Sequence, residues 1–152
     1  MKREPWEFRF RLEGLPPSAN TLVRPAMLRG PKPRARLVKT KHAGAWLVGA
    51  QLALQAAWRR TRGREAPLAG VPLELRVVFA VSRVSADVSN RVKALEDALT
   101  GIAWADDCQV VELFARKVVA PAEHVLGVVR VAAGVDETTQ RRISRSRKAG
   151  AR

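Results

Sequence analysis

The spacing of hydrophobic and polar residues along the chain predicts four β-strands. Apolar side chains alternate with charged ones over residues 6–12, and they alternate again over residues 73–81. A period of two residues is typical of a strand with one buried face. Two further strands are expected over residues 109–118 and 125–132, on either side of a turn that contains Pro121.

Two other segments carry apolar residues at helical spacing. The first covers residues 43–60 and ends in arginines, which complement the negative end of the helix dipole. The second covers residues 89–100 and is followed by Gly101, a common helix-terminating residue. The order strand, helix, strand, helix, strand, strand predicts an α+β fold with a small mixed or antiparallel sheet and two main helices.

The length and the apolar content bound the domain organisation. The chain has 152 residues, 47% of them hydrophobic, which is enough for one domain with its own core, expected over residues 1–135. Residues 136–152 are basic and almost free of apolar side chains, so we expect a disordered basic tail. No apolar run approaches the roughly 18–20 residues of a membrane span, and the start does not resemble a signal peptide, so a cytoplasmic location is expected. The single cysteine, Cys108, excludes an intramolecular disulfide and is expected to be a small strand residue.

The charge balance indicates a polyanionic partner. Lysine and arginine number 28 against 14 acidic residues, so the formal net charge is +14. Such a surface binds nucleic acid by neutralising phosphates and releasing counterions. Residues 24–41 form a basic stretch interrupted by proline and glycine, which we expect to be a mobile loop beside DNA. Its candidate phosphate-binding residues are Arg24, Arg29, Lys32, Arg34, Arg36, Lys39 and Lys41.

Against this basic background, acidic residues gather in one short segment. Five of the 14 lie between residues 87 and 107: Asp87, Glu96, Asp97, Asp106 and Asp107. A carboxylate cluster repels a polyanion unless divalent cations lie between them, so the pattern favours a Mg²⁺-dependent enzyme that acts on nucleic acid. The alternative is a non-catalytic basic nucleic-acid-binding protein in which the acids only cap and solubilise a helix.

The predicted helix over residues 89–100 places polar side chains on one face. At about 100° per residue, Asn90, Lys93 and Asp97 fall within an arc of about 60°, opposite its apolar residues. Asp87 precedes this helix, and Asp106-Asp107 follows it at the start of the next strand. These carboxylates can converge on one divalent ion. The alternative is an ordinary amphipathic helix with a Lys93/Asp97 pair at i,i+4.

Together these residues resemble the RusA-type Holliday junction resolvases. The similarity is carried by residues 87–99, read as DVSNRVKALEDAL, followed by Gly101, Trp104, Asp106-Asp107 and Gln109-Val110. The segment Pro16-Pro17-Ser18-Ala19-Asn20 also looks like the family's Pro-Pro-Ser-x-Asn signature. Asn20 then has two readings, as a DNA contact or as a turn residue that hydrogen-bonds its local backbone. The similarity spans most of residues 15–118 and leaves the basic tail outside.

The resemblance implies a function and a set of site residues. It implies a homodimeric, Mg²⁺-dependent endodeoxyribonuclease, with Mn²⁺ as the alternative ion, that prefers four-way DNA junctions and resolves them by symmetric paired nicks. The family's metal-binding acids fall on Asp87 and Asp107, its essential lysine falls on Lys93, and Asp97 and Asp106 match further acidic positions that could bind metal. Asn90 is a candidate DNA contact on the same helix face.

One position departs from the family pattern. Well-known members carry a second aspartate two residues after the first, where this chain has Ser89. A hydroxyl is a poorer Mg²⁺ ligand than a carboxylate. Asp97 or Asp106 could supply the missing charge, and activity is therefore expected. The alternative is a weakened resolvase-like protein without a full metal site.

Overall fold

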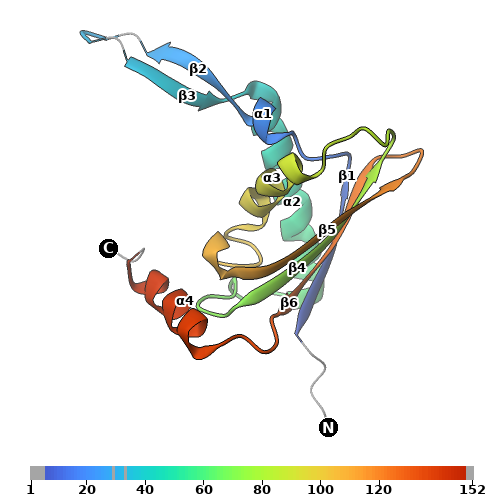
Figure 1. Cartoon of the computed structure of the whole chain (residues 1–152), viewed down its shortest axis with the longest axis vertical. Coiled ribbons are helices and arrows are strands. Elements are labelled where there is room, and N and C mark those ends of the chain that lie inside the picture. Colours follow the sequence, from blue (N-terminus) through green and yellow to red (C-terminus); the bar gives the residue numbers. More distant parts are fainter. Residues whose placement is uncertain (1–5, 29, 33, 150–152) are drawn as a thin grey trace.

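A computed structural model describes residues 6–28, 30–32 and 34–149 of the chain. The elements follow in the order β1 (Glu7–Glu13), α1 (Ala19–Leu22), β2 (Val23–Leu28), β3 (Arg34–Lys39), α2 (Lys41–Arg62), β4 (Leu73–Val81), α3 (Ser89–Leu99), the short 3₁₀ helix η1 (Asp107–Gln109), β5 (Val110–Val119), β6 (His124–Val131) and α4 (Glu137–Ala149). Figure 1 shows their arrangement. No helix in this part of the chain is long and apolar enough to cross a membrane.

Four strands form a mixed sheet in the order β1-β6-β4-β5. Strand β6 is antiparallel to both β1 and β4, whereas β4 and β5 are parallel. Parallel neighbours need a crossover connection, which α3 provides. The predicted α+β fold is confirmed, and each of the four expected strands is present within one or two residues of its expected bounds.

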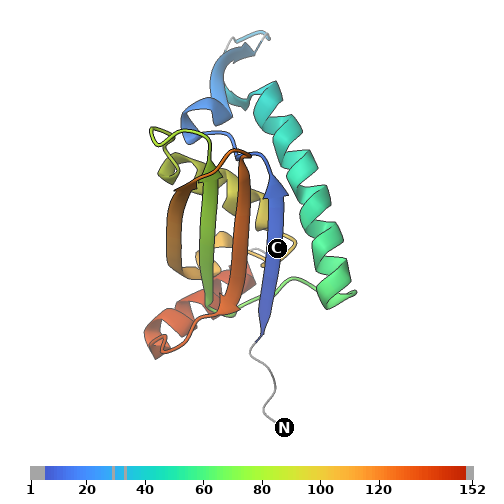
Figure 2. The same cartoon turned by 90° about the vertical axis from the view of Figure 1, so that its right-hand side faces the viewer.

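The core lies between one face of this sheet and two helices, α2 and α3 (Figures 1 and 2). Leu54 of α2 and Leu95 of α3 are fully buried against the inward-facing strand residues Phe8 and Phe79. The apolar residues whose spacing predicts the two helices therefore form the face that each helix buries. Helix α2 is longer than expected because Thr40 caps its start, accepting a hydrogen bond from Ala43 N at 3.2 Å.

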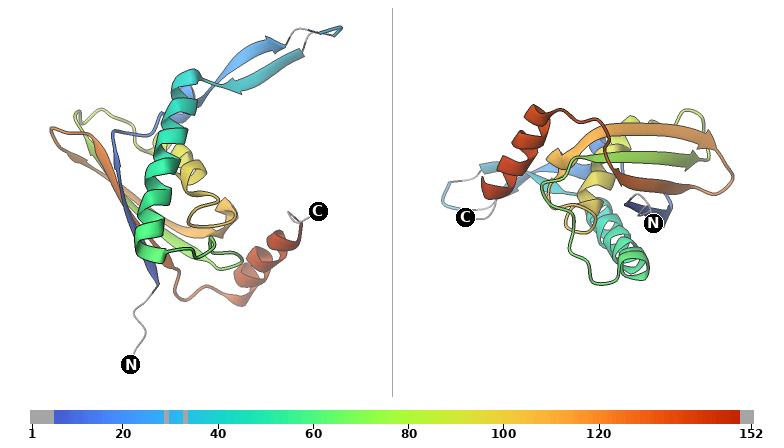
Figure 3. Two further views of the ribbon diagram at one scale, coloured as in Figure 1. Left: turned by 180° about the vertical axis from the view of Figure 1, so that it is seen from behind. Right: turned by 90° about the horizontal axis from the view of Figure 1, so that it is seen from below.

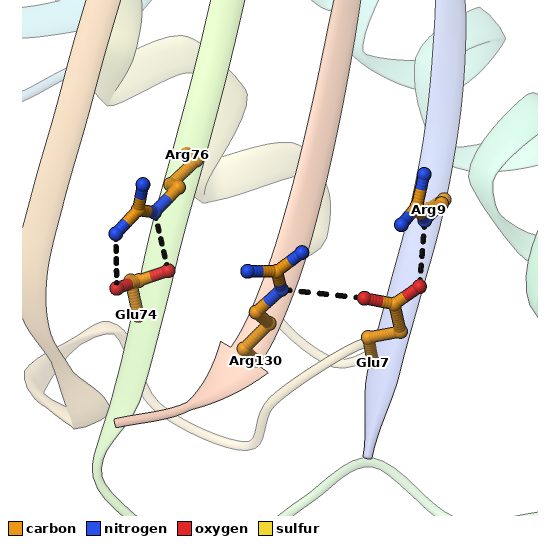
Figure 4. Close-up of polar contacts among 5 residues, drawn as sticks. All are labelled: Glu7, Arg9, Glu74, Arg76 and Arg130. Atoms are coloured by element: carbon orange, nitrogen blue, oxygen red, sulfur yellow. Dashed lines mark hydrogen bonds and ion pairs between the residues drawn. The ribbon is translucent and has the colours of Figure 1, made fainter. Parts of the chain in front are cut away.

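The other face of the sheet carries charged side chains in pairs (Figure 4). Arg9 Nε lies 2.6 Å from Glu7 Oε1, and Arg130 Nε lies 3.3 Å from the other oxygen of Glu7. On β4, Arg76 donates to both carboxylate oxygens of Glu74. Exposed ion pairs contribute little to stability, because water screens both charges. The stability of the sheet therefore comes mainly from the core on the opposite face.

The basic stretch over residues 24–41 is a β-hairpin, so the expectation of a loop is wrong for most of it. Strands β2 and β3 pair antiparallel, with Arg24 opposite Val38 and Ala26 opposite Arg36. Figure 3 shows the hairpin extending away from the four-stranded sheet. Pro25 is tolerated because β2 has only one neighbouring strand. Residues 34–39 show no regular alternation, since Leu37 and Val38 are adjacent and nearly all of the strand is exposed, so the local pattern does not predict a strand here.

The C-terminal segment also carries an element that the sequence pattern does not predict. Residues expected to be a disordered tail include helix α4. Asp136 begins it, accepting hydrogen bonds from Thr139 N at 2.9 Å and Thr139 Oγ1 at 2.8 Å. Ile143 is only 4% exposed, and Gln140 Nε2 donates to Gly70 O at 3.2 Å. One isoleucine is too weak a pattern to indicate an amphipathic helix without its tertiary contacts.

Candidate active site

The connection from β4 to α3 presents Asp87 at the start of the helix. Its Oδ1 accepts hydrogen bonds from Ser89 Oγ at 2.7 Å and Ser89 N at 3.0 Å, and its Oδ2 accepts one from Asn90 Nδ2. The Ser89 hydroxyl is the main reason that the pKa of Asp87 lies below its usual value. Asp87 is therefore an exposed, ionised carboxylate whose orientation is set by its two neighbours.

One helical turn further along α3, Lys93 lies between two carboxylates. Its Nζ is 2.6 Å from Asp107 Oδ2 and 3.1 Å from Asp97 Oδ1. The hydrogen bond with Asp107 is the main cause of a strongly raised Lys93 pKa. About half of the Lys93 side chain is exposed. The ammonium is thus permanently charged and open to solvent, and the expected Lys93/Asp97 pair forms together with a third member from outside the helix.

The segment after α3 places Asp106 and Asp107 by means of a buried glutamine. Gln109 is 2% exposed, and its Oε1 accepts hydrogen bonds at 3.1 Å from both Ala105 N and Asp106 N. Its Nε2 donates to Val71 O at 3.0 Å. Asp106 caps η1 by accepting from Cys108 N, which is the main cause of its lowered pKa. Cys108 is therefore an exposed residue of η1 and not a strand residue.

A lysine on the neighbouring strand β5 supports the connection that carries Asp87. Lys117 Nζ donates to Val84 O and, at 3.1 Å, to Ala86 O. Two carbonyl acceptors on one ammonium fix the connection just before Asp87. Neither Lys117 nor Gln109 is distinguished by the sequence pattern as a positioning residue, because both contacts join segments more than 30 residues apart.

Glu96 is another acidic residue of α3 that lies near this group. It is partly buried, and burial is the main cause of its raised pKa, with Asp107 and Asp97 contributing in the same direction. The sequence includes Glu96 in the acidic cluster but gives it no role. Asp107 acts on Glu96 through its charge because the Lys93–Asp107 contact brings η1 close to α3.

The candidate site therefore consists of two groups on one face of α3. Asp87, Ser89 and Asn90 form the first, and Lys93 joins Asp97 and Asp107 in the second. Asn90 and Lys93 are separated by a helical rise of about 4.5 Å. Oxygen donors of this type are those that Mg²⁺ prefers, so the residues fit the ion in chemical type. Within the described residues, however, no three acidic, histidine or cysteine side chains are close enough together to hold a metal ion.

The basic residues expected to contact DNA lie on the exposed hairpin and beside it. Arg24, Arg34 and Arg36 share one face of the ribbon, because Arg24 pairs with Val38, Ala26 with Arg36, and Leu28 with Arg34. The remaining exposed candidates are Lys32 at the hairpin tip, Lys39 at the end of β3, Lys41 at the start of α2 and Asn20 in α1. Asn90 binds Asp87, and Arg29 lies outside the described residues.

The Pro16–Asn20 segment is tied to α3 at its first residue. Arg91 of α3 donates from Nη1 to Pro16 O, and both prolines of the segment are buried. Ser18 O accepts hydrogen bonds from Thr21 N and Thr21 Oγ1. These contacts give the segment a structural role in holding α1 against α3, and they leave Asn20 exposed.

Comparison with known proteins agrees with the family resemblance of the sequence. A family model described as endodeoxyribonuclease RusA matches residues 30–126, about two thirds of the chain. The match covers β3 of the hairpin, α3 and all of the acidic cluster, whereas β2 lies before its start. No curated protein matches the chain.

Proposed function

Because this chain belongs to the RusA family of endodeoxyribonucleases, we propose that it is a Mg²⁺-dependent nuclease that resolves four-way DNA junctions by two symmetric nicks. The observation that carries the proposal is the position of Lys93 between Asp97 and Asp107 on the open face of α3. In a protein of net charge +14, a local group of acids weakens the attraction for DNA. A role in phosphodiester hydrolysis explains why the acids are there.

Lys93 has the properties of an electrostatic catalyst. Its raised pKa keeps the ammonium protonated at any physiological pH, and its exposure lets a phosphate approach. Negative charge develops on the phosphate oxygens as the bond to the leaving oxygen breaks, and a fixed cation stabilises that charge. Asp97 and Asp107 hold the ammonium in place, so little reorganisation is needed when the substrate binds.

Asp87 and Asp107 are the proposed metal-binding residues, with Asp97 and Asp106 as further ligands. When bound, Mg²⁺ lowers the pKa of its water and neutralises charge on the phosphate. Ser89 holds Asp87 ionised through the 2.7 Å hydrogen bond, and this supports a ligand role for Asp87 despite the missing second aspartate. Mn²⁺ is the alternative ion because it accepts the same oxygen donors.

The hairpin is the proposed DNA-binding element. A two-stranded ribbon is narrow enough to enter a major groove, and its arginine face offers phosphate contacts. A homodimer would present two such sites related by a two-fold axis, which matches the symmetry of a four-way junction. A nuclease with this substrate would act in the cytoplasm.

A nicking assay on a synthetic four-way junction tests the proposal. Mg²⁺-dependent cleavage at symmetric positions in two opposing strands is expected, with less cleavage of a matched linear duplex. Sedimentation of the protein with the junction should give two chains per junction. Binding without cleavage in Mg²⁺ and in Mn²⁺ would instead support the non-catalytic basic nucleic-acid-binding protein.

A further inference from the structure

A pocket separate from the acidic group lies at one end of the sheet. Its volume is about 660 Å³. The ends of β1 and β4 meet the start of β6 there, because His124 pairs with both Glu13 and Ala80. The β4–α3 connection and the first turns of α2 complete the lining.

Two arginines, Arg83 and Arg91, line the pocket. The ring of His42 and the hydroxyl groups of Ser82 and Ser85 lie beside them. Trp46 and Leu15 give it an apolar side. Arginine side chains, hydroxyls and one aromatic ring are the groups that proteins use to bind the phosphate and the flanking sugar or base of a nucleic-acid strand.

Among the residues that the structure describes, Glu123 is the one acidic side chain that lines this pocket. Its Oε1 accepts hydrogen bonds from Ser82 Oγ at 2.6 Å and Ser82 N at 3.3 Å. These bonds are the main cause of its lowered pKa, and Arg91 and Arg83 lower it further through charge. Yet neither arginine forms an ion pair with Glu123 within 4.0 Å in the described part of the chain. The two guanidinium groups therefore face a carboxylate without contacting it.

Arg91 also retains unused hydrogen-bonding capacity. Its Nη1 donates to Pro16 O, whereas its buried Nε has no hydrogen-bond partner among the described residues. Because this Nε is buried, a ligand does not reach it, and Arg91 contributes to the pocket through the charge of its guanidinium. The pocket thus combines two arginines with space for an anion.

We propose that this pocket binds one phosphate group of the DNA strand, between Arg83 and Arg91. The inference rests on the proposed nuclease function and adds a contact that the hairpin does not provide. The pocket shares the β4–α3 connection and α3 itself with the acidic group, since Ala86 and Arg91 lie on either side of Asp87. A strand held here would be fixed next to Asp87, and the pocket would position the substrate without taking part in the chemistry.

Binding measured without cleavage tests this proposal independently of nuclease activity. The full-length protein is titrated into a dye-labelled four-way junction in EDTA at several NaCl concentrations, and fluorescence anisotropy gives Kd. Arg83→Gln should weaken binding and reduce the slope of log Kd against log salt by about 0.9, the value for one phosphate contact on duplex DNA. Arg60→Gln, an equal charge loss at the exposed far end of α2, is the matched control and should leave the slope unchanged.

Two further variants separate a pocket contact from a general charge effect. Glu123→Gln keeps an acceptor for Ser82 and removes the negative charge, so it should tighten junction binding. In the Arg83→Gln background the gain should be smaller, because the two residues face the same anion. Arg91→Lys keeps the charge but loses the planar guanidinium, so it should weaken binding. Thermal unfolding of the same variant reports whether the contact with Pro16 O is retained.

The two histidines of the chain provide a local readout. His42 lines the pocket and His124 does not, so nuclear magnetic resonance should show larger shifts at the His42 ring when a short thymidine oligonucleotide is added. If inorganic phosphate shifts His42 but the oligonucleotide does not, the pocket binds free phosphate and the proposal is overturned. Arg83→Gln with the slope and affinity of Arg60→Gln would overturn it as well, whether or not the wild-type protein nicks junctions.

Discussion

The ammonium group of Lys93 lies 2.6 Å from Oδ2 of Asp107, although 14 residues separate them in the chain. This contact joins the middle of α3 to the 3₁₀ turn that begins β5. It depends on the crossover between the parallel strands β4 and β5, which returns the chain along α3 before β5 starts. The proposed catalytic lysine and metal-binding aspartate are thus brought together by the topology of the sheet.

Removing either proposed metal-binding carboxylate should separate cleavage from binding. Asp87→Asn or Asp107→Asn is expected to lower the nicking rate by about 100-fold or more, the usual effect of losing one group that stabilises a transition state. Junction binding in EDTA should be unchanged or tighter, because negative charge facing the phosphates is removed. Glu65→Gln, a carboxylate paired with Arg62 at the end of α2, is the control. Near-wild-type nicking by either aspartate variant would refute the assignment.

Lys93→Met should abolish nicking with little change in stability. The side chain is half exposed, so its ion pairs contribute at most about 1 kcal/mol to the free energy of unfolding. Lys93→Arg retains the charge and should recover part of the activity.

Because the pKa of Lys93 is raised, its charge and its pairing persist until the pH exceeds the ordinary lysine value. The nicking rate should therefore show no alkaline decline from this residue between pH 7 and about pH 10. Such a decline in wild type that Lys93→Arg removes would show that the pKa of Lys93 is not raised, whereas near-wild-type nicking by Lys93→Met would refute its catalytic role.

Ser89→Asp should lower the Mg²⁺ concentration needed for half-maximal nicking. The substitution places a second carboxylate where the Ser89 hydroxyl now donates to Asp87 at 2.7 Å. Two adjacent carboxylates repel each other without a cation, so binding of Mg²⁺ should become more favourable. Ser89→Ala separates this effect from loss of the hydrogen bond and should raise the requirement. An unchanged or raised Mg²⁺ requirement in Ser89→Asp would mean that residue 89 does not face the ion, or that Asp97 or Asp106 already supplies the missing charge.

Glu96→Gln should stabilise the fold near pH 7 and lose this advantage in acid. Burial raises the pKa of Glu96 above its unfolded value, so ionisation favours the unfolded chain and wild-type stability falls as the pH rises through this interval. The neutral glutamine avoids that loss. The difference in Tm between the variant and wild type is therefore expected to be positive at pH 7 and close to zero at about pH 4, below both pKa values of Glu96. A difference independent of pH would show that Glu96 does not titrate in this way.

The C-terminal basic segment should contribute affinity without selectivity. Truncation after Gly134 removes α4 and is expected to weaken binding of junction and duplex alike, with a salt slope reduced by about 0.9 for each lost phosphate contact. It also exposes the surface that Ile143 covers, which should cost about 1.5–3 kcal/mol. The triple variant Arg141→Gln, Arg142→Gln, Arg145→Gln retains Ile143 and isolates the charge effect. Loss of junction selectivity at matched salt in either protein would make the segment a specificity element.

The sequence by itself determined the elements whose patterns are local. Alternation over residues 73–81 and helical spacing over residues 89–100 each reflect which side of a single element is buried, so they predict β4 and α3 closely. The acidic cluster and the motif around Asp87 likewise lie within a short stretch, and they identify the family that the match over residues 30–126 confirms. Where the apolar signal is diluted by prolines or arginines, as in the hairpin and α4, the local pattern is not sufficient.

Tertiary structure decided which distant groups meet. The Lys93–Asp107 pair, the support of the Asp87 connection by Lys117, and the cationic pocket around Arg91 all join segments that the chain separates by 14 to 75 residues. Such contacts follow from strand order and register, which a single sequence does not encode in any local pattern. The charge of each group is a property of the sequence, whereas its partner, its burial and therefore its pKa depend on the fold.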